Sequence, residues 1–414
     1  MSDDIPKWSS GGLIGPGLLV AATGVGAGDL IAAAVAGRQF GLAVLWVVIV
    51  GAAGKWLLNE GIARWQLATG ESIIKAWATR LPRWVFWYFG GYLIVWAFLV
   101  GGALGAACGV AFKALWPDVP GSVGIWATIH ALVGWTIVLL GNYRFFEKVM
   151  QVLVALMFVF VFACGVWLAP AGSEILAGLV IPVIPAGGLW IVLGLMGGVG
   201  GSATILCYGY WIKERGWNSP DVIPRARWDL LIAYGLTAAF GVAMVILAST
   251  ARPADASGTA LVLALADQLE TLLGPTGKLL FLGGFWCAVF TSLLGVWQGV
   301  PYLFEDWWNN RTTAVNSTDS TGGRSRPYLG FLAYLAVPPL VLQLFDRPLL
   351  IVVLYAIAGA FFMPLLASTL LVLNNRKQWV GELTNPRWIN FGLISTLLLF
   401  GTLFIVELKN RFFG

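Results

Sequence analysis

Two glycine-rich stretches decide the fold of this chain. Residues 15–37 read GPGLLVAATGVGAGDLIAAAVAG, and residues 188–212 read GLWIVLGLMGGVGGSATILCYGYWI. Both stretches are apolar enough to form helices. Each is interrupted near its middle by closely spaced glycines, at Gly24–Gly28 in the first and at Gly197–Gly201 in the second. Because each interruption follows a Pro/Gly start at a similar distance, the two stretches share one pattern.

The composition around these stretches is typical of a membrane protein. Of the 414 residues, 59% are hydrophobic and only 11% are charged, whereas soluble domains carry about 25% charged residues. The chain also contains 22 Trp, 24 Phe and 52 Gly. These figures exclude a soluble enzyme, a disordered chain and a disulfide scaffold. They indicate an all-α polytopic membrane protein whose solvent is the lipid bilayer.

Eleven runs of the chain are predicted to cross the membrane, since a helix needs about 20 mostly apolar residues to do so. The first ten residues lack a basic stretch, and the first run is longer than that of a signal peptide. We therefore expect the first run to be retained as a span. The runs cover residues 13–37, 40–66, 84–112, 123–141, 145–169, 188–212, 226–248, 277–304, 328–346, 348–373 and 389–407.

The interrupted runs are the first and the sixth, and this offset of five predicts an inverted repeat. Because five is an odd number of crossings, the second copy must have the opposite orientation to the first. Glycine-interrupted segments at matching positions in two such halves are the best sequence pointer to a transport site. Unwinding a helix in lipid frees carbonyl and amide groups, and each costs several kcal/mol when it is unsatisfied. We expect a substrate, an ion or water to pair with them.

Three charged residues at membrane depth need an account. Asp29 follows the first glycine cluster, and a charge near mid-membrane costs at least about 2.5–3.5 kcal/mol without a partner or a cavity. Lys55, in the second run, is expected to compensate Asp29 or Glu60 across the bundle. Glu60 and Arg64 are four residues apart and share one helix face, which predicts an ion pair near the inner end of that run.

The spans lack the groups that several other chemistries require. From Trp84 to Phe112 and from Leu279 to Leu303 the only ionisable side chains are Cys and Tyr, so no proton relay is expected there. His130 is the single His, too few for a zinc site, and we expect it to be buried or interfacial. The four Cys lie inside apolar runs, which argues against disulfides. The net charge of +5 is scattered, which excludes nucleic acid as a partner, and no nucleophile–base pair indicates an enzyme.

The Lys and Arg residues of the loops predict the orientation. A cytoplasmic N-terminus puts sixteen of them inside and seven outside, in agreement with the positive-inside rule. We therefore expect a cytoplasmic N-terminus and an external C-terminus, in a bacterial inner membrane, with a monomer possible. Residues 257–273 are predicted to form an amphipathic helix on the outer surface. Residues 309–327 are predicted to form a polar inner loop.

The chain resembles the Nramp family of metal-ion transporters over nearly its whole length. Its first run is similar to the family's first helix, whose pattern is GPG…DPGN…AG…FG. Further matches follow in collinear order: ATGESI at 68–73, Tyr143–Lys148, ILAGLVIP at 175–182, Arg227 with Asp229, and Leu349-Leu350 through Met363-Pro364-Leu365. The resemblance implies the LeuT-type fold, with 11 transmembrane helices in one transmembrane domain, 1–414. That fold has two inverted five-helix repeats, here 13–169 and 185–374, and an extra helix at 389–407; its first and sixth helices are broken.

The metal-site motifs of the family are replaced in this sequence. Where the family has Asp-Pro-Gly-Asn, this chain has Gly26-Ala27-Gly28-Asp29, so the metal-binding Asp maps onto Gly26 and the Asn onto Asp29. The family's sixth-helix Met-Pro-His maps onto Gly201-Ser202-Ala203. The third-helix acids associated with proton coupling are also missing, and the tenth-helix Gln maps near Ala356.

An all-oxygen site remains at the two breaks. Oxygen ligands suit Mg²⁺ and Ca²⁺ rather than Fe²⁺ or Zn²⁺, and Mg²⁺ keeps several waters. We therefore expect a transporter or facilitator of a divalent cation, Mg²⁺ ahead of Mn²⁺, that works by alternating access without proton coupling. The cation is its substrate, and no cofactor is implied. The predicted substrate-binding residues are Thr23, Gly24, Gly26, Asp29, Lys55, Glu60, Gly201, Ser202 and Thr204, with Asp29, Gly26 and Gly201 as metal ligands.

Two alternatives stay open. LeuT-type breaks also bind organic anions through the positive ends of half-helices, so an amino acid or organic anion paired with Lys55 is the second reading. The third reading is a scaffold or sensor with a degenerate site. Against it, two glycine-rich breaks are costly in lipid when they bind nothing.

Overall fold

A computed structural model describes residues 15–251, 259–311, 325–345 and 362–412. Every regular element within these ranges is a helix. The helices of the first half are α1 (Gly17–Gly24), α2 (Ala27–Phe40), η1 (Gly41–Val44), α3 (Leu45–Thr69), α4 (Ile73–Arg80), α5 (Arg83–Leu115), α6 (Val123–Leu140), α7 (Tyr143–Trp167) and α8 (Gly172–Val180).

The second half begins with another interrupted helix. Its elements are α9 (Leu189–Gly198), η2 (Ala203–Leu206), α10 (Cys207–Glu214), η3 (Pro220–Val222), α11 (Ile223–Ala251), α12 (Thr259–Asn310), α13 (Arg326–Ala336), η4 (Pro338–Phe345), α15 (Phe362–Asn374), α16 (Lys377–Val380), η5 (Gly381–Leu383) and α17 (Arg387–Phe412). Part of the tenth predicted run, including Ala356, lies outside the described residues.

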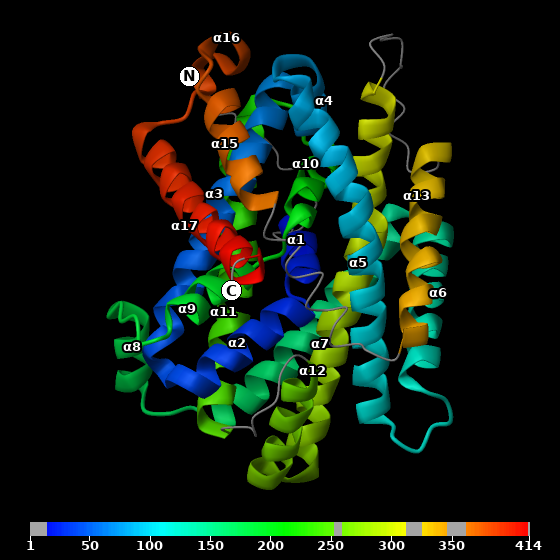
Figure 1. Cartoon of the computed structure of the whole chain (residues 1–414), viewed down its shortest axis with the longest axis vertical. Helices are drawn as coiled ribbons and strands as arrows, with labels where there is room; N and C mark the ends of the chain where they lie inside the picture. The colour runs from blue at the N-terminus through cyan, green and yellow to red at the C-terminus, as the bar shows by residue number, and fades with distance from the viewer. Residues whose placement is uncertain (1–14, 252–258, 312–324, 346–361, 413–414) are drawn as a thin grey trace, which may run out of the picture.

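The described residues contain eight helices that are long and apolar enough to cross a membrane. The predicted number of eleven therefore stays a prediction, although each predicted run overlaps a described helix. The first run forms two half-helices, α1 and α2, and the sixth forms α9 and α10, so both predicted breaks are confirmed. In Figure 1, α1 lies at the centre of the molecule, with α6 and α13 outside α5 on one side and α15 and α17 on the other.

Three run boundaries differ from the sequence prediction for local reasons. The second run was predicted from residue 40, but Gly41 adopts φ +60° and ends α2, so α3 begins only at Leu45. The ninth run changes from α-helix to 3-10 helix at Pro338–Pro339, because proline has no amide hydrogen for the helix. The amphipathic segment 257–273 is helical from Thr259, and Gly274 (φ +73°) separates it from the eighth span inside α12.

Candidate transport site

The first break is a stretch of two residues between α1 and α2. Val25 and Gly26 leave the helical conformation, with Gly26 extended at φ −124° and ψ −169°. The Ser292 hydroxyl of α12 lies against this stretch, 2.9 Å from the Thr23 carbonyl oxygen and 3.1 Å from that of Val25. A Cβ on Gly26 would lie 2.8 Å from the same hydroxyl oxygen. The eighth predicted run therefore pairs with carbonyls that the break frees.

Asp29 joins the first break to the second. It is the third residue of α2, and its Oδ2 accepts a hydrogen bond from the Gly26 amide at 3.1 Å. Its Oδ1 accepts another from the Gly200 amide at 2.8 Å, 171 residues further along the chain. One carboxylate therefore caps the N-terminus of α2 and also binds an amide freed between α9 and η2.

The second break passes through two glycines in the left-handed region. Gly200 has φ +83° and Gly201 has φ +78°, values that glycine adopts without the steric cost of a side chain. The backbones of the two breaks touch: a Cβ on Gly24 would lie 3.0 Å from the Gly200 carbonyl carbon, and one on Gly201 would lie 3.3 Å from the Gly24 Cα. The two predicted glycine clusters thus form one crossing.

Lys55 reaches this crossing from α3. Its side chain is completely buried, with 0% exposure. Its ammonium donates a hydrogen bond to the carbonyl oxygen of Gly201 and lies 5.5 Å from the centre of the Phe400 ring of α17. Lys55 therefore lies at the crossing of the two breaks, and its role in binding substrate stays a prediction.

The three predicted hydroxyl groups are buried around the crossing. Ser202 Oγ accepts a hydrogen bond from the Trp96 indole N–H at 3.2 Å. A Cβ on Gly201 would lie 2.6 Å from Thr204 Oγ1, which places that oxygen beside the second break. Thr23 Oγ1 faces Gly295 of α12, is buried, and has no hydrogen-bond partner within the described ranges. Among the described residues, the Thr23 hydroxyl is therefore an unsatisfied buried group beside the first break.

Glu60 belongs to an ion-pair cluster rather than to the crossing. Its Oε1 pairs with the Arg64 guanidinium, as predicted from their spacing, and also with Arg227 Nε of α11 at 2.9 Å. Arg64 in turn donates to the carbonyl oxygens of Leu383 and Thr384. Among the residues that the structure describes, Glu60 makes no hydrogen bond or ion pair with Asp29 or Gly201. The position of Glu60 therefore favours a structural role, in which it ties α3 to α11.

A second buried carboxylate holds the start of α1, and composition and periodicity did not single it out. Asp229 of α11 accepts hydrogen bonds from the Gly15 amide at 3.1 Å, the Gly17 amide at 2.7 Å and the Tyr208 hydroxyl at 3.0 Å. A Cβ on Gly15 or Gly17 would lie 2.5 Å from Asp229 atoms, so both glycines are needed for this approach. The GPG motif and the Asp229 match therefore have one physical explanation.

Other residues around the site were also missed because their contacts are tertiary. Ser292 and Trp96 lie on runs that were noted for their lack of ionisable groups, and neither has a local sequence signal. The only cue in the sequence was that a freed carbonyl needs a hydrogen-bond donor, and this cue does not identify the donor.

His130 is buried, as one of the two predicted positions for it required. Its ring nitrogens contact the Trp126 carbonyl and the Trp286 N–H. The four Cys are free and buried.

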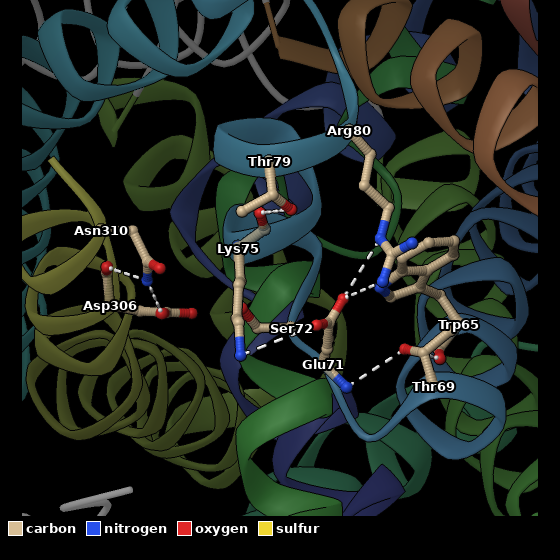
Figure 2. Close-up of polar contacts among 9 residues, drawn as sticks. All are labelled: Trp65, Thr69, Glu71, Ser72, Lys75, Thr79, Arg80, Asp306 and Asn310. Carbon is tan, nitrogen blue, oxygen red and sulfur yellow. Dashed lines mark hydrogen bonds and ion pairs between the residues drawn. The ribbon is translucent and has the colours of Figure 1, made fainter. Parts of the chain in front are cut away.

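The ATGES turn links α3 to α4 through polar contacts (Figure 2). Glu71 pairs with Arg80 at 2.8 Å and with Lys75 at 3.6 Å, and its amide donates to Thr69 Oγ1 at 3.1 Å. Ser72 caps the N-terminus of α4 by accepting from the Lys75 amide at 3.0 Å. This motif therefore fixes a turn and is separate from the crossing.

A polar cavity of about 220 Å³ lies between the end of α10 and α12. It is lined by Tyr210, Lys213, Glu214, Asn218 and Tyr302. Tyr302 donates a hydrogen bond to Glu214 at 2.9 Å, and Tyr210 donates one to Asp306 at 2.6 Å. Since α10 is the half-helix that follows the second break, this cavity lies along the same broken helix as the site.

Comparisons with known proteins agree with the resemblance seen in the sequence. The model of the family "Natural resistance-associated macrophage protein-like" (Nramp) matches residues 17–408. The divalent metal cation transporter MntH of Klebsiella pneumoniae (strain 342) is 24% identical over 397 residues, which cover 91% of this chain and 89% of that protein.

Solved structures of other proteins have the same fold. The manganese transporter of Eremococcus coleocola, solved with an aromatic bis-isothiourea compound, has a TM-score of 0.76 at 16% identity. The match covers 96% of this chain and 86% of that transporter. MhsT in complex with L-phenylalanine has a TM-score of 0.64 at 18% identity, and the match covers 96% of this chain and 98% of MhsT. The expected all-helical LeuT-type fold is thereby confirmed.

Proposed function

This chain belongs to the Nramp family, and on that premise we propose that it moves a divalent cation across the membrane by alternating access. The observation that carries the proposal is the crossing of the two helix breaks, where Asp29 binds the Gly26 and Gly200 amides. Transporters of this architecture bind substrates and ions at such breaks near mid-membrane. MntH of Klebsiella pneumoniae is a divalent metal cation transporter, which supports the same class of cargo for this chain.

The donor set favours Mg²⁺ ahead of Mn²⁺. The described residues contain no group of three or more His, Cys, Asp and Glu side chains that could hold a metal ion. The crossing offers oxygen atoms instead: the Asp29 carboxylate, the Thr23 and Thr204 hydroxyls, and backbone carbonyls. Mg²⁺ prefers oxygen and keeps several of its waters, so it needs few direct protein ligands.

We propose that transport is not coupled to protons. Two buried carboxylates outside the crossing already have partners: Glu60 pairs with two arginines, and Asp229 holds the start of α1. From Trp84 to Phe112, within α5, there is no Asp, Glu or His. A titratable chain through the membrane is what a proton relay requires.

We also propose how the chain lies in the membrane. The chain forms one transmembrane domain of two inverted repeats, 13–169 and 185–374, with an eleventh helix at 389–407, in a bacterial inner membrane. The N-terminus is cytoplasmic and the C-terminus is outside, which follows from the loop charges. This orientation puts the polar cavity at Glu214 and Tyr302 on the inner side of the site. A monomer suffices for the mechanism.

Lys55 favours a second candidate function within the same fold. Its buried ammonium lies at the crossing, where a small organic acid or an amino acid would find a positive charge. The positive ends of half-helices also attract carboxylates. The second candidate is therefore transport of a small organic anion or amino acid.

A thermal-stability screen on the purified protein separates the two candidates. If the cargo is a divalent cation, Mg²⁺ at about a hundredfold excess over its Kd should stabilise the fold by about 2.7 kcal/mol, and Mn²⁺ should need a higher concentration. Amino acids and small carboxylates should leave the melting temperature unchanged. Stabilisation by those organic solutes and by no divalent cation would overturn the cation proposal in favour of the second candidate.

A further inference from the structure

The crossing already holds a positive charge that belongs to the protein. The Lys55 ammonium donates to the Gly201 carbonyl, which is one of the backbone oxygens that the second break exposes. The rest of the side chain packs against the same break, since a Cβ on Gly200 would lie 3.6 Å from Lys55 Cγ. Lys55 thus occupies an oxygen that the proposed function would give to a cation.

We propose that Lys55 is a tethered counter-cation of the transport site, bound to the Gly201 carbonyl when the site is empty and displaced when a divalent cation enters. The inference rests on the proposed function and specifies how that site is regulated. It makes Lys55 a residue that sets the affinity for the cargo by competing with it.

Charge balance at the second break supports this role. The Asp29 carboxylate accepts from the Gly200 amide, and the Lys55 ammonium donates to the carbonyl of the next residue. The empty crossing therefore carries one negative and one positive side chain, bound to the backbone of two consecutive residues. A divalent cation bound to Asp29 and the Gly201 carbonyl would meet the ammonium at short range, where repulsion is strong in a water-poor interior. The cation and the ammonium therefore exclude each other.

The ammonium has a second contact, which it can keep when it leaves the Gly201 oxygen. The Phe400 ring centre lies 5.5 Å from Lys55 Nζ, within the range of a cation–π contact, and Phe400 is buried. The four-carbon stem of lysine allows the ammonium to move between a carbonyl and a ring without any backbone change. Lys55 can thus leave the Gly201 oxygen and remain inside the protein.

The consequence for transport concerns the empty carrier. When Lys55 binds the Gly201 carbonyl and Asp29 binds two freed amides, groups released by the breaks are satisfied without cargo. Unsatisfied groups of this kind cost several kcal/mol each in lipid. We infer that these pairings are kept while the empty protein reorients, which lowers the barrier of that step. Net transport requires that step, whereas exchange of cargo for cargo does not.

The test compares Lys55→Met with the wild type in two measurements, using Mn²⁺ as the probe. Binding to the purified protein is measured by calorimetry. Net efflux and exchange of radiolabelled Mn²⁺ are measured in proteoliposomes. Methionine has a similar volume and no charge, so the fold should tolerate it. We expect Lys55→Met to bind Mn²⁺ about tenfold more tightly, within the usual range of coupling between two sites. It should keep exchange but lose most net efflux.

Two further variants serve as controls. Lys55→Arg keeps the charge and should keep the wild-type affinity within about twofold, well inside a tenfold change. Lys113→Met removes another lysine that donates to backbone carbonyls: Lys113 is in the last turn of α5 and binds the carbonyl oxygens of Pro117 and Val119 in the loop that follows. It should leave binding, exchange and net efflux unchanged.

Each outcome decides a separate question. If the wild type binds Mn²⁺ or Mg²⁺ and Lys55→Met binds with the same Kd, or loses exchange and net efflux together, the tethered-cation role is wrong while the proposed function stands. If the wild type binds no divalent cation, the proposed function fails and takes this inference with it. If Lys55→Met abolishes binding of a small carboxylate, Lys55 is an anion site, and the inference is overturned.

Discussion

Replacing Asp29 with Ala is expected to abolish divalent-cation binding and to lower transport by about a hundredfold or more. The side chain supplies the only carboxylate that contacts both breaks within the described residues. Hydrogen bonds to a charged group contribute about 1.5–3 kcal/mol each, and about 1.4 kcal/mol is a factor of ten in an equilibrium constant. Losing two of them, together with the charge that attracts the cargo, therefore gives an effect of this size.

Asp29→Asn separates the two contributions of this carboxylate. The amide oxygen of asparagine still accepts a hydrogen bond from a break amide, so the variant should melt closer to the wild type than Asp29→Ala does. Asp29→Asn lacks the negative charge, so its affinity for Mg²⁺ should fall nearly as far as that of Asp29→Ala. The control is Asp118→Asn, which changes an exposed carboxylate in the loop after α5 and should have no effect. Wild-type affinity in Asp29→Ala would remove Asp29 from the site.

Replacing Asp229 with Ala is expected to release the start of α1 and to lower transport by about tenfold or more. The carboxylate accepts from the Gly15 and Gly17 amides and from the Tyr208 hydroxyl, so the substitution leaves three buried donors without it. Each hydrogen bond to a charged group contributes about 1.5–3 kcal/mol. The free energy lost with three of them therefore exceeds the free-energy difference of a few kcal/mol that commonly separates two conformers. The equilibrium should shift to a state in which α1 is detached from α11.

Labelling of an introduced cysteine measures this shift. Ala226 is buried on α11 beside Tyr208, which donates to its carbonyl, and the native Cys are buried. In Ala226→Cys, a membrane-impermeant maleimide should react slowly, and adding Asp229→Ala should speed the reaction. Tyr208→Phe removes one of the three bonds and should give an intermediate rate. Cation affinity should change by only a few-fold, because the crossing is intact. An unchanged labelling rate would show that Asp229 does not hold α1.

The helix breaks were predictable because their signal is local. Glycine clusters inside apolar runs mark positions where a helix cannot continue cheaply, and Gly200 and Gly201 do adopt left-handed conformations there. The pairing of Glu60 with Arg64 follows from helical spacing alone, and the structure confirms it. The addition of Arg227 was not predictable, because it comes from a helix 167 residues further on.

The contacts that close the site could not be read from the sequence. Ser292, Trp96 and the Gly201 carbonyl are brought together by packing among α5, α12 and the two breaks, and none of them has a distinctive neighbourhood in the chain. The positions of Lys55 and Asp29 at membrane depth predicted that each needed a partner. Identifying the partners as backbone groups of the second break required the fold.

Cation transport without proton coupling can be tested directly by measuring uptake of Mg²⁺ into proteoliposomes that report internal Mg²⁺ and internal pH together. We expect saturable uptake down a Mg²⁺ gradient, weaker uptake of Mn²⁺, no acidification of the lumen, and loss of the signal in Asp29→Ala. A wild-type protein that moves no Mg²⁺, Mn²⁺ or Ca²⁺ under a gradient would contradict cation transport. Acidification in step with Mg²⁺ entry would contradict transport without proton coupling.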